Sequence, residues 1–169
     1  MALIKNNQLL DDPWVALADG DEIPDGADCV IVSYDRWAAA NPDLAAYNGR
    51  LGIRLTSAQS PSLIRDHLDR FDLIVFDFDK FKDGRAFSHA RLLRERYGYT
   101  GEVRAAGDFI VDQIGFLHRG GFDAFEVDEA LSESTFNTYL HELSYAYQPA
   151  GDVCQPIWAL RNRHKAAAE

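Results

Sequence analysis

Short apolar runs alternate with longer amphipathic segments along most of the chain. The runs are nearly continuous in apolar residues, which is typical of strands buried on both faces, as in a parallel sheet covered by other elements. The pattern predicts five such strands: Cys29 to Ser33, Leu51 to Leu55, Leu73 to Asp77, Glu102 to Ala106, and Ala124 to Val127.

The segments between these runs have the spacing and the end signals of helices. Ser60 followed by Pro61 is typical of an N-cap with proline in the first turn. Gly120-Gly121 offers a left-handed stop for the preceding helix. The predicted helices cover residues 35–47 (interrupted by Pro42), 61–71, 85–97, 109–119 and 134–147.

Five βα units predict an α/β fold with a five-stranded, mainly parallel sheet. The first architecture is a flavodoxin- or receiver-like sheet with right-handed crossovers and helices on both faces. The alternative is a partial (βα) barrel, because polar residues interrupt several strands and barrel interiors hold such layers. Those residues are Arg54, Asp77, Arg104 and Glu126. The chain has 169 residues, whereas a complete barrel needs about 250.

The chain divides into three segments in this interpretation. Residues 1–28 are rich in turn signals between short apolar pieces and form a β-rich N-terminal extension. Residues 29–150 form the α/β domain, and residues 151–169 form a C-terminal tail with a basic end.

Composition narrows the classes of partner and the cellular location. The balance of 17 basic and 27 acidic residues gives a net charge of −10, which repels nucleic acid phosphates and anionic lipid. No apolar run approaches the roughly 20 residues of a membrane helix. The first seven residues lack the apolar core of a secretory signal. The two cysteines form no metal or redox motif, and Cys29 is expected to be a small buried residue. We therefore expect a cytoplasmic protein.

Polar residues follow three of the predicted strands, at the edge where α/β sheets bind ligands. Asp83-Gly84-Arg85 forms a turn that opens a helix, so backbone N–H groups and a guanidinium can converge on a small anion. If the strands are parallel, Arg104 lies near the same edge, and Asp108, Asp112 and Gln113 follow the next strand. The candidate anion or ligand site is therefore Gly84, Arg85, Arg104, Asp108, Asp112 and Gln113. The structural alternative is that Asp83 and Asp108 cap helices and the arginines pair with nearby acids.

Other kinds of site have weaker support. Asp77, Asp79 and Asp83 can offer oxygen ligands to Mg²⁺, but alternating aspartates are more often turn residues, and we predict no metal site. The histidines are scattered, and no glycine-rich phosphate loop is present. The cofactor is left open, because flavodoxin-like folds can bind a flavin without such a loop.

The predicted helix after residue 84 is unusually basic for an acidic protein. Arg91, Arg94 and Arg96 form a candidate docking surface for an acidic partner or a redox protein. The alternative is a solvated face whose late arginines interact with the helix dipole.

A run of residues in the second half of the chain is distinctive. It reads DGRAFSHARLLRERYGYTGEVRAAGD over residues 83–108, followed by Asp112-Gln113 and by GFDAF over residues 121–125. This run resembles the bacterial domain-of-unknown-function family 934. Two positions depart from the family pattern: residues 77–81 replace a shorter segment, and Gly120 stands where a cysteine is frequent.

The resemblance implies a link to sulfite reduction. Members are labelled as oxidoreductases of that process because they are encoded beside the sulfite reductase haemoprotein, which is an association and supplies no mechanism. It implies an accessory or oxidoreductase-associated protein of assimilatory sulfite reduction, docking to sulfite reductase or its electron donor and binding a small anion. The alternative is a non-catalytic receiver-like interaction module. The sequence leaves catalytic activity and oligomeric state undecided.

Overall fold

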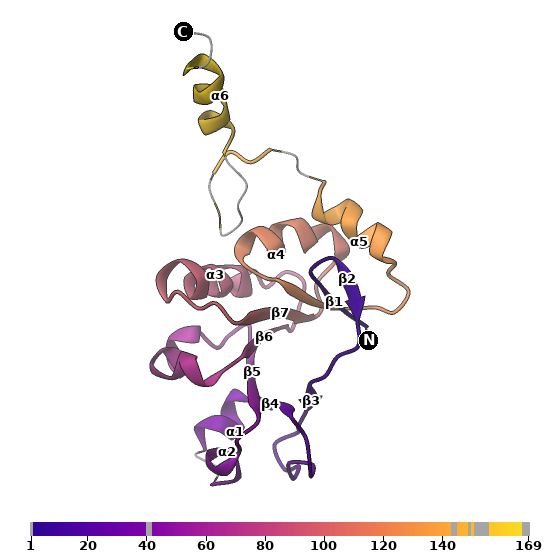
Figure 1. The fold of residues 1–169 in the computed structure, drawn as a ribbon, viewed down its shortest axis with the longest axis vertical. Coiled ribbons are helices and arrows are strands. Elements are labelled where there is room, and N and C mark those ends of the chain that lie inside the picture. Colours follow the sequence, from indigo (N-terminus) through magenta and orange to yellow (C-terminus); the bar gives the residue numbers. More distant parts are fainter. Residues whose placement is uncertain (1, 40–41, 143–144, 149, 151–155, 167–169) are drawn as a thin grey trace.

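The computed structural model describes residues 2–39, 42–142, 145–148, 150 and 156–166 (Figure 1). For residues 162–166 it describes the backbone alone. The predicted C-terminal tail, including Cys154, lies partly outside the described residues.

All strands belong to one eight-stranded sheet in the order β2-β1-β8-β7-β6-β5-β4-β3. From β3 to β8 neighbouring strands are parallel, whereas β1 is antiparallel to both β8 and β2. The strands are β1 (Ala2–Lys5), β2 (Gln8–Leu10), β3 (Val15–Ala16), β4 (Cys29–Ser33), β5 (Arg50–Thr56), β6 (Leu73–Phe78), β7 (Glu102–Gly107) and β8 (Ala124–Val127). The five predicted strands are confirmed to within one residue at each end.

Helices follow the strands as expected, but they are shorter than the sequence predicted and include 3₁₀ and π-helical segments. They are α1 (Tyr34–Ala38), α2 (Pro42–Ala46), the 3₁₀ helix η1 (Pro61–Arg70), α3 (Arg85–Arg91) with the π-helical η2 (Leu92–Arg96), η3 (Val111–Gln113), α4 (Ile114–Gly120), α5 (Glu133–Leu140) and α6 (Ile157–Ala166). Ser60 caps η1 with Pro61 in the first turn, and Gly121 ends α4 at φ 109°, as predicted.

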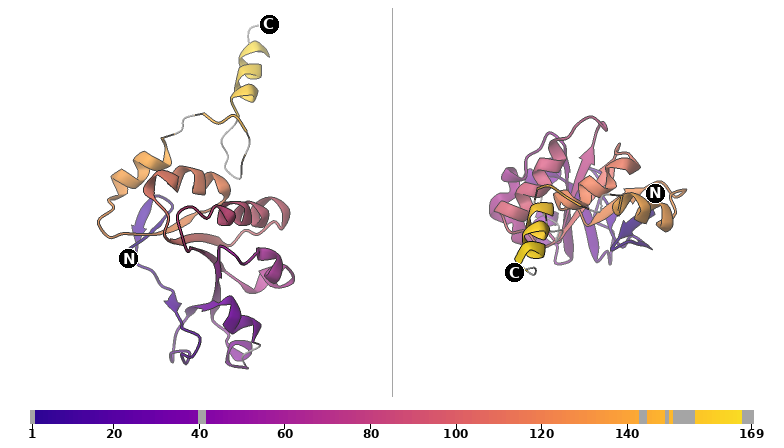
Figure 2. Two further views of the ribbon diagram at one scale, coloured as in Figure 1. Left: turned by 180° about the vertical axis from the view of Figure 1, so that it is seen from behind. Right: turned by 90° about the horizontal axis from the view of Figure 1, so that it is seen from above.

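The strand order corrects the first predicted architecture. A doubly wound sheet reverses its direction at a switch point, but here β4 to β8 lie side by side in chain order. Right-handed crossovers between consecutive neighbours place the helices that connect β4 to β8 on one face. The five-stranded flavodoxin-like sheet with helices on both faces is therefore not confirmed. The alternative, a partial (βα) barrel, fits the curled sheet (Figure 2).

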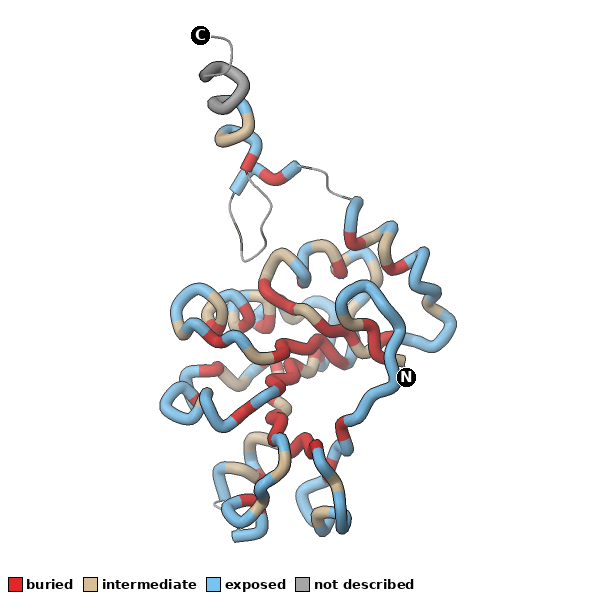
Figure 3. The backbone as a smooth tube through the Cα atoms, viewed as in Figure 1, coloured by how far each residue is buried: buried red, intermediate tan, exposed pale blue. Residues whose placement is uncertain are grey.

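The two faces of the sheet have different cores, and the alternation of strand residues sets them apart. On the convex face, strand residues such as Ile53, Phe76 and Ala105 pack against the helices in the main core. On the concave face a smaller cluster gathers around Trp14, which comes from the segment before β3: Trp14, Cys29, Ile31, Leu73, Val75 and Ala106. Cys29 is buried, as expected. Figure 3 shows that the buried residues are concentrated along the strands of the sheet.

The predicted N-terminal extension is β-rich and is part of the same sheet. Strand β1 pairs with β8, and β3 pairs with β4, so residues 1–28 contribute strands at both edges. The segment between β2 and β3 crosses the open concave side and brings Trp14 onto Gly52. A Cβ atom at Gly52 would lie 3.2 Å from the Trp14 ring, so this close approach favours glycine.

None of the helices in the described part of the chain has the length and apolarity that crossing a membrane requires.

Candidate functional site

Successive residues of a strand point to opposite faces of the sheet, and several of those that point to the concave face are charged. Arg54 on β5 bridges two carboxylates: its Nη1 lies 3.2 Å from Asp77 Oδ2, and its Nη2 lies 3.1 Å from Glu126 Oε1. Strands β5 and β8 are three strand spacings apart, about 14 Å in a flat sheet. A direct ion pair between them is possible because the sheet curls.

Arg104 lies at the centre of this charged layer, and its side chain is 0% exposed. Its Nη1 donates to Asp12 Oδ2 at 2.7 Å, and its Nε donates to Glu102 Oε1 at 2.9 Å. Burial lowers the pKa of Arg104, but hydrogen bonds and charge from Asp12 and Glu102 outweigh burial and raise that pKa above its ordinary value. Lys5 on β1 also contacts Glu102, at 2.7 Å. Arg104 is therefore a permanently charged group enclosed by acids.

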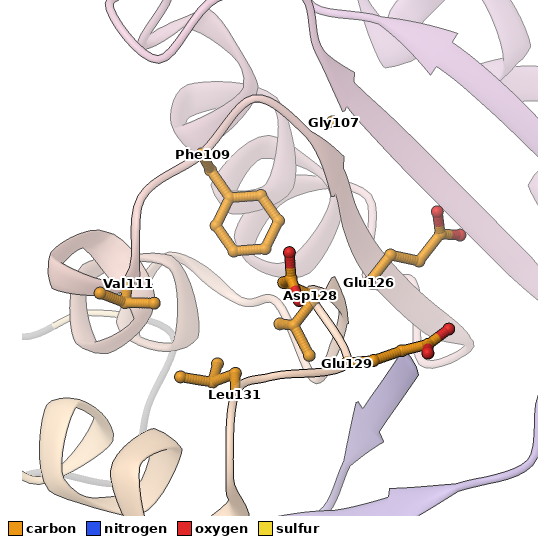
Figure 4. Close-up of a pocket in the computed structure, with 8 residues that line it drawn as sticks. Gly107, Phe109, Val111, Glu126, Asp128, Glu129 and Leu131 are labelled. Atoms are coloured by element: carbon orange, nitrogen blue, oxygen red, sulfur yellow. The ribbon is translucent and has the colours of Figure 1, made fainter. Parts of the chain in front are cut away.

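A hollow of about 520 Å³ lies at the carboxyl ends of β7 and β8 (Figure 4). Its lining combines apolar side chains with carboxylates and contains no basic residue: Gly107, Phe109, Val111, Glu126, Val127, Asp128, Glu129 and Leu131. The carboxylates of Glu126 and Glu129 point away from the Phe109 ring. We call this hollow the acidic pocket. Its charge disfavours a small anion.

Two of the sequence-predicted ligand residues hold a loop in place. The Phe81 backbone N–H donates to Asp108 Oδ2 at 3.3 Å, and Gln113 Nε2 donates to the Phe81 carbonyl oxygen at 3.3 Å. The Gln113 side-chain oxygen also accepts from the Ile110 backbone N–H. Asp108 and Gln113 thus fasten the loop between β6 and α3 to the loop after β7. Asp112 is exposed in η3.

Gly84 ends that same β6–α3 loop and Arg85 is the first residue of α3, so neither lies near the partners of Arg104. The Arg85 guanidinium pairs with Asp83, donating from Nε to Oδ1 at 2.8 Å. This hydrogen bond lowers the pKa of Asp83 to about 2. An anion at Gly84 and Arg85 would have to displace Asp83 from an exposed ion pair, which is a weak obstacle. Anion binding at Gly84 and Arg85 stays a prediction. Arg104 does not belong to this group, because it pairs with Asp12 and Glu102.

The three arginines predicted to dock a partner have different surroundings. Arg94 points inward: it donates to the carbonyl oxygens of Gly121, Tyr99 and Gly101 and, from Nη2, to Asp123 Oδ2 at 2.8 Å. Arg91 is exposed and pairs with Glu95 at 2.8 Å. Arg96 is also exposed. Arg91 and Arg96 are accessible to a partner, and Arg94 joins α3 and η2 to the sheet.

Arg91 lines a second hollow, of about 480 Å³, formed by α3, α4, Tyr147, Gln148 and Ala150. Its described lining contains aromatic side chains and two arginines but no acid: Phe87, Ser88, Arg91, Phe116, Arg119, Gly120, Tyr147, Gln148 and Ala150. We call this hollow the basic groove. Phe116 is 56% exposed and Tyr147 is 78% exposed, which is unusual for large aromatic residues.

Sequence reasoning missed Phe116, Arg119 and Tyr147 as surface residues. For Phe116 a signal was present: the apolar stripe of its helix runs through Ile114 and Leu117, which are buried, so Phe116 falls outside that stripe. Nothing in the sequence places Tyr147 beside it. Sequence reasoning also missed Asp12, the partner of Arg104.

The described side chains offer little to a metal ion. No three or more histidine, cysteine, aspartate or glutamate side chains among them are grouped to hold one. Asp77 pairs with Arg54, and Asp83 pairs with Arg85.

Comparison with known proteins identifies one family. Residues 52–158 match the family model described as "Bacterial protein of unknown function (DUF934)". This span begins in β5 and ends at the start of α6, so it includes the acidic pocket and the basic groove. No curated protein matches the chain.

Proposed function

Because the chain belongs to the bacterial DUF934 family, we propose that it is an accessory protein of assimilatory sulfite reduction that works by binding a protein partner. The partner is sulfite reductase or its electron donor. The link to sulfite reduction rests on the association that the family resemblance implies. The mode of action rests on the basic groove.

The observation that carries partner binding is the basic groove itself. On a protein of net charge −10, the part of its lining that the structure describes includes Arg91 and Arg119 and no acid. Large aromatic side chains stand exposed beside these arginines, among them Phe116. Arginine and aromatic residues together are enriched in the energetically dominant parts of protein interfaces. The groove therefore has the composition of a docking site.

The charge pattern also favours rapid association with an acidic partner. A local positive patch attracts a negative surface and raises the association rate, and salt screens that attraction. A small anion at Gly84 and Arg85 is an additional proposal, separate from the groove. We base no step of chemistry on it.

Growth of a deletion strain on sulfate, sulfite or sulfide as the sole sulfur source tests the process. We expect growth on sulfide and failure on sulfite, restored by the wild-type gene. Normal growth on sulfite would contradict the assignment to sulfite reduction.

Binding of the purified protein to purified sulfite reductase haemoprotein and to its electron donor tests the mode of action. Isothermal titration calorimetry with Arg91→Glu should show weakened binding to one of them. The matched control is Arg65→Glu, an equal charge reversal at an exposed residue of η1 outside the groove. Equal affinity of both variants and the wild type would contradict docking through the groove.

A further inference from the structure

Two of the hollows on this small protein, the acidic pocket and the basic groove, have opposite charge. The acidic pocket has Glu126, Asp128 and Glu129 in its lining and no basic residue. Among the described residues that line the basic groove, Arg91 and Arg119 are charged and none is an acid, although Arg91 pairs with Glu95 beside the groove. Since the whole chain is acidic, this local excess of positive charge favours a negatively charged occupant.

The helices themselves explain why the groove is open and aromatic. Helix α3 buries Ala86 and Ala90, and α4 buries Ile114 and Leu117, so both helices are already anchored in the core. The two helices lie side by side: a Cβ atom at Gly120 would lie 3.8 Å from the Phe87 carbonyl oxygen, which is an ordinary contact distance. Phe116 is not needed for this packing and points to the surface, where it is 56% exposed. An aromatic side chain held in water on a rigid helix is typical of a binding surface.

We propose that the basic groove binds an acidic linear segment of the partner, anchored by one aromatic or large aliphatic side chain. The anchor packs between Phe87 and Phe116, and carboxylates of the segment accept hydrogen bonds from Arg91. The positive charge of Arg119, which also donates to the Gln148 carbonyl oxygen at 2.9 Å, attracts the same carboxylates. The exposed Arg91–Glu95 pair exchanges readily, because surface ion pairs contribute little. Guanidinium groups match carboxylates in geometry, which gives the segment a fixed register. The inference deepens the proposed function and rests on it.

The size of the groove favours a segment over a second copy of the chain. A volume of about 480 Å³ holds one or two large side chains. A stable dimer typically buries about 800 Å² of each partner. Linear segments are commonly recognised in this way, with one side chain inserted in a pocket and charged groups on either side of it.

Selection from a displayed library of random peptides tests the inference with the intact chain. Peptides are selected on the wild-type protein, after removal of those that bind the double variant Arg91→Glu, Phe116→Ala. We expect the survivors to share aspartate or glutamate near a single aromatic or aliphatic residue. Survivors without acidic enrichment, or no survivors at all, would overturn the inference.

Affinities of one selected peptide locate the binding site. Fluorescence anisotropy should show roughly tenfold weaker binding for Phe116→Ala and for Arg91→Glu, and unchanged binding for Arg65→Glu. Both groove residues are exposed, so these variants are expected to fold. Affinity of the wild type should fall with rising salt, and that of Arg91→Glu should fall less. Equal losses in all three variants would overturn the inference.

Two further outcomes separate the inference from the proposed function. If the selected peptide binds the groove but the deletion strain grows normally on sulfite, the link to sulfite reduction fails and the binding site stands. If the strain fails on sulfite but is fully restored by the double variant, the proposed process stands and the groove inference is overturned. Light scattering measures the oligomeric state as a third check. A wild-type dimer that Phe116→Ala converts to a monomer would mean that a second copy of the chain occupies the groove, which would overturn the inference.

Discussion

Arg104 on β7 donates a hydrogen bond to Asp12 at 2.7 Å, and this bond fastens the segment between β2 and β3 across the concave face of the sheet. Asp12 is partly exposed, whereas the Arg104 side chain is fully buried. The closure of the concave face therefore depends on an ion pair between residues far apart in the chain.

Replacement of Arg104 by methionine should strongly destabilise the protein. Glu102, which is 8% exposed, would keep a buried charge with one partner fewer. Loss of one member of a buried ion pair costs about 3–5 kcal/mol in the free energy of unfolding. Denaturant unfolding measures the loss, and Arg54→Met, at a side chain 29% exposed, should show a smaller one. Wild-type stability of Arg104→Met would show that the network contributes nothing.

Arg94→Lys should destabilise the fold, although the sequence made Arg94 a candidate docking residue. A lysine cannot reach the carbonyl oxygens of Tyr99, Gly101 and Gly121 together with Asp123. Loss of several such bonds is expected to lower the free energy of unfolding by roughly 2 kcal/mol. The exposed Arg96→Lys is the matched control, with a change within about 0.5 kcal/mol. Equal stability of the two variants would leave Arg94 free to act in docking.

Gly107→Ala should be destabilising because of its backbone conformation. Gly107 has φ 86°, and a Cβ atom there would lie 2.6 Å from the Phe78 carbonyl oxygen. Left-handed backbone alone costs a non-glycine residue roughly 1–2 kcal/mol, and the clash adds to it. At Gly84, where φ is −78° and a Cβ atom would meet no other atom within 4 Å, alanine should be tolerated. Thermal unfolding of both variants distinguishes them, and equal midpoints would contradict the geometry.

The Asp83 carboxyl should titrate at about pH 2 because Arg85 donates hydrogen bonds to it, which lowers its pKa. Since the pKa in the folded state is below the ordinary value of 3.8, the stabilisation is present above that value and is lost as the pH falls toward 2. Carbon-13 NMR of the carboxyl group follows the titration. Arg85→Gln should move the pKa back toward 3.8, and an unchanged pKa would assign the shift to another group.

The strands were predictable because each carries its own signal. A strand buried on both faces is a nearly continuous apolar run, and Leu73–Phe78 shows this without reference to any other part of the chain. Helix ends were predictable for the same reason, as Ser60 and Gly121 show. Local sequence, however, does not state which strand pairs with which.

The order of strands in a sheet depends on how the crossovers run, and the sequence contains one indication of it. That indication was the set of polar residues within the strands. Arg54, Asp77, Arg104 and Glu126 all lie on the concave face, as a barrel interior requires. Chain length argued against a complete barrel, but a half-closed sheet needs fewer strands. The different surroundings of Arg91 and Arg94 were also beyond sequence reasoning, because the partner Asp123 of Arg94 lies in another βα unit.

The pairing of β1 with β8 has a consequence for synthesis on the ribosome. Strand β1 emerges first, but its partner β8 is the last strand of the sheet to be made. Until then Leu3 and Ile4, both buried in the folded protein, lack the strand with which they pair on one side. The nascent chain therefore exposes an apolar segment until β8 has been made, a period in which chaperone binding or slow association with another chain competes with correct folding.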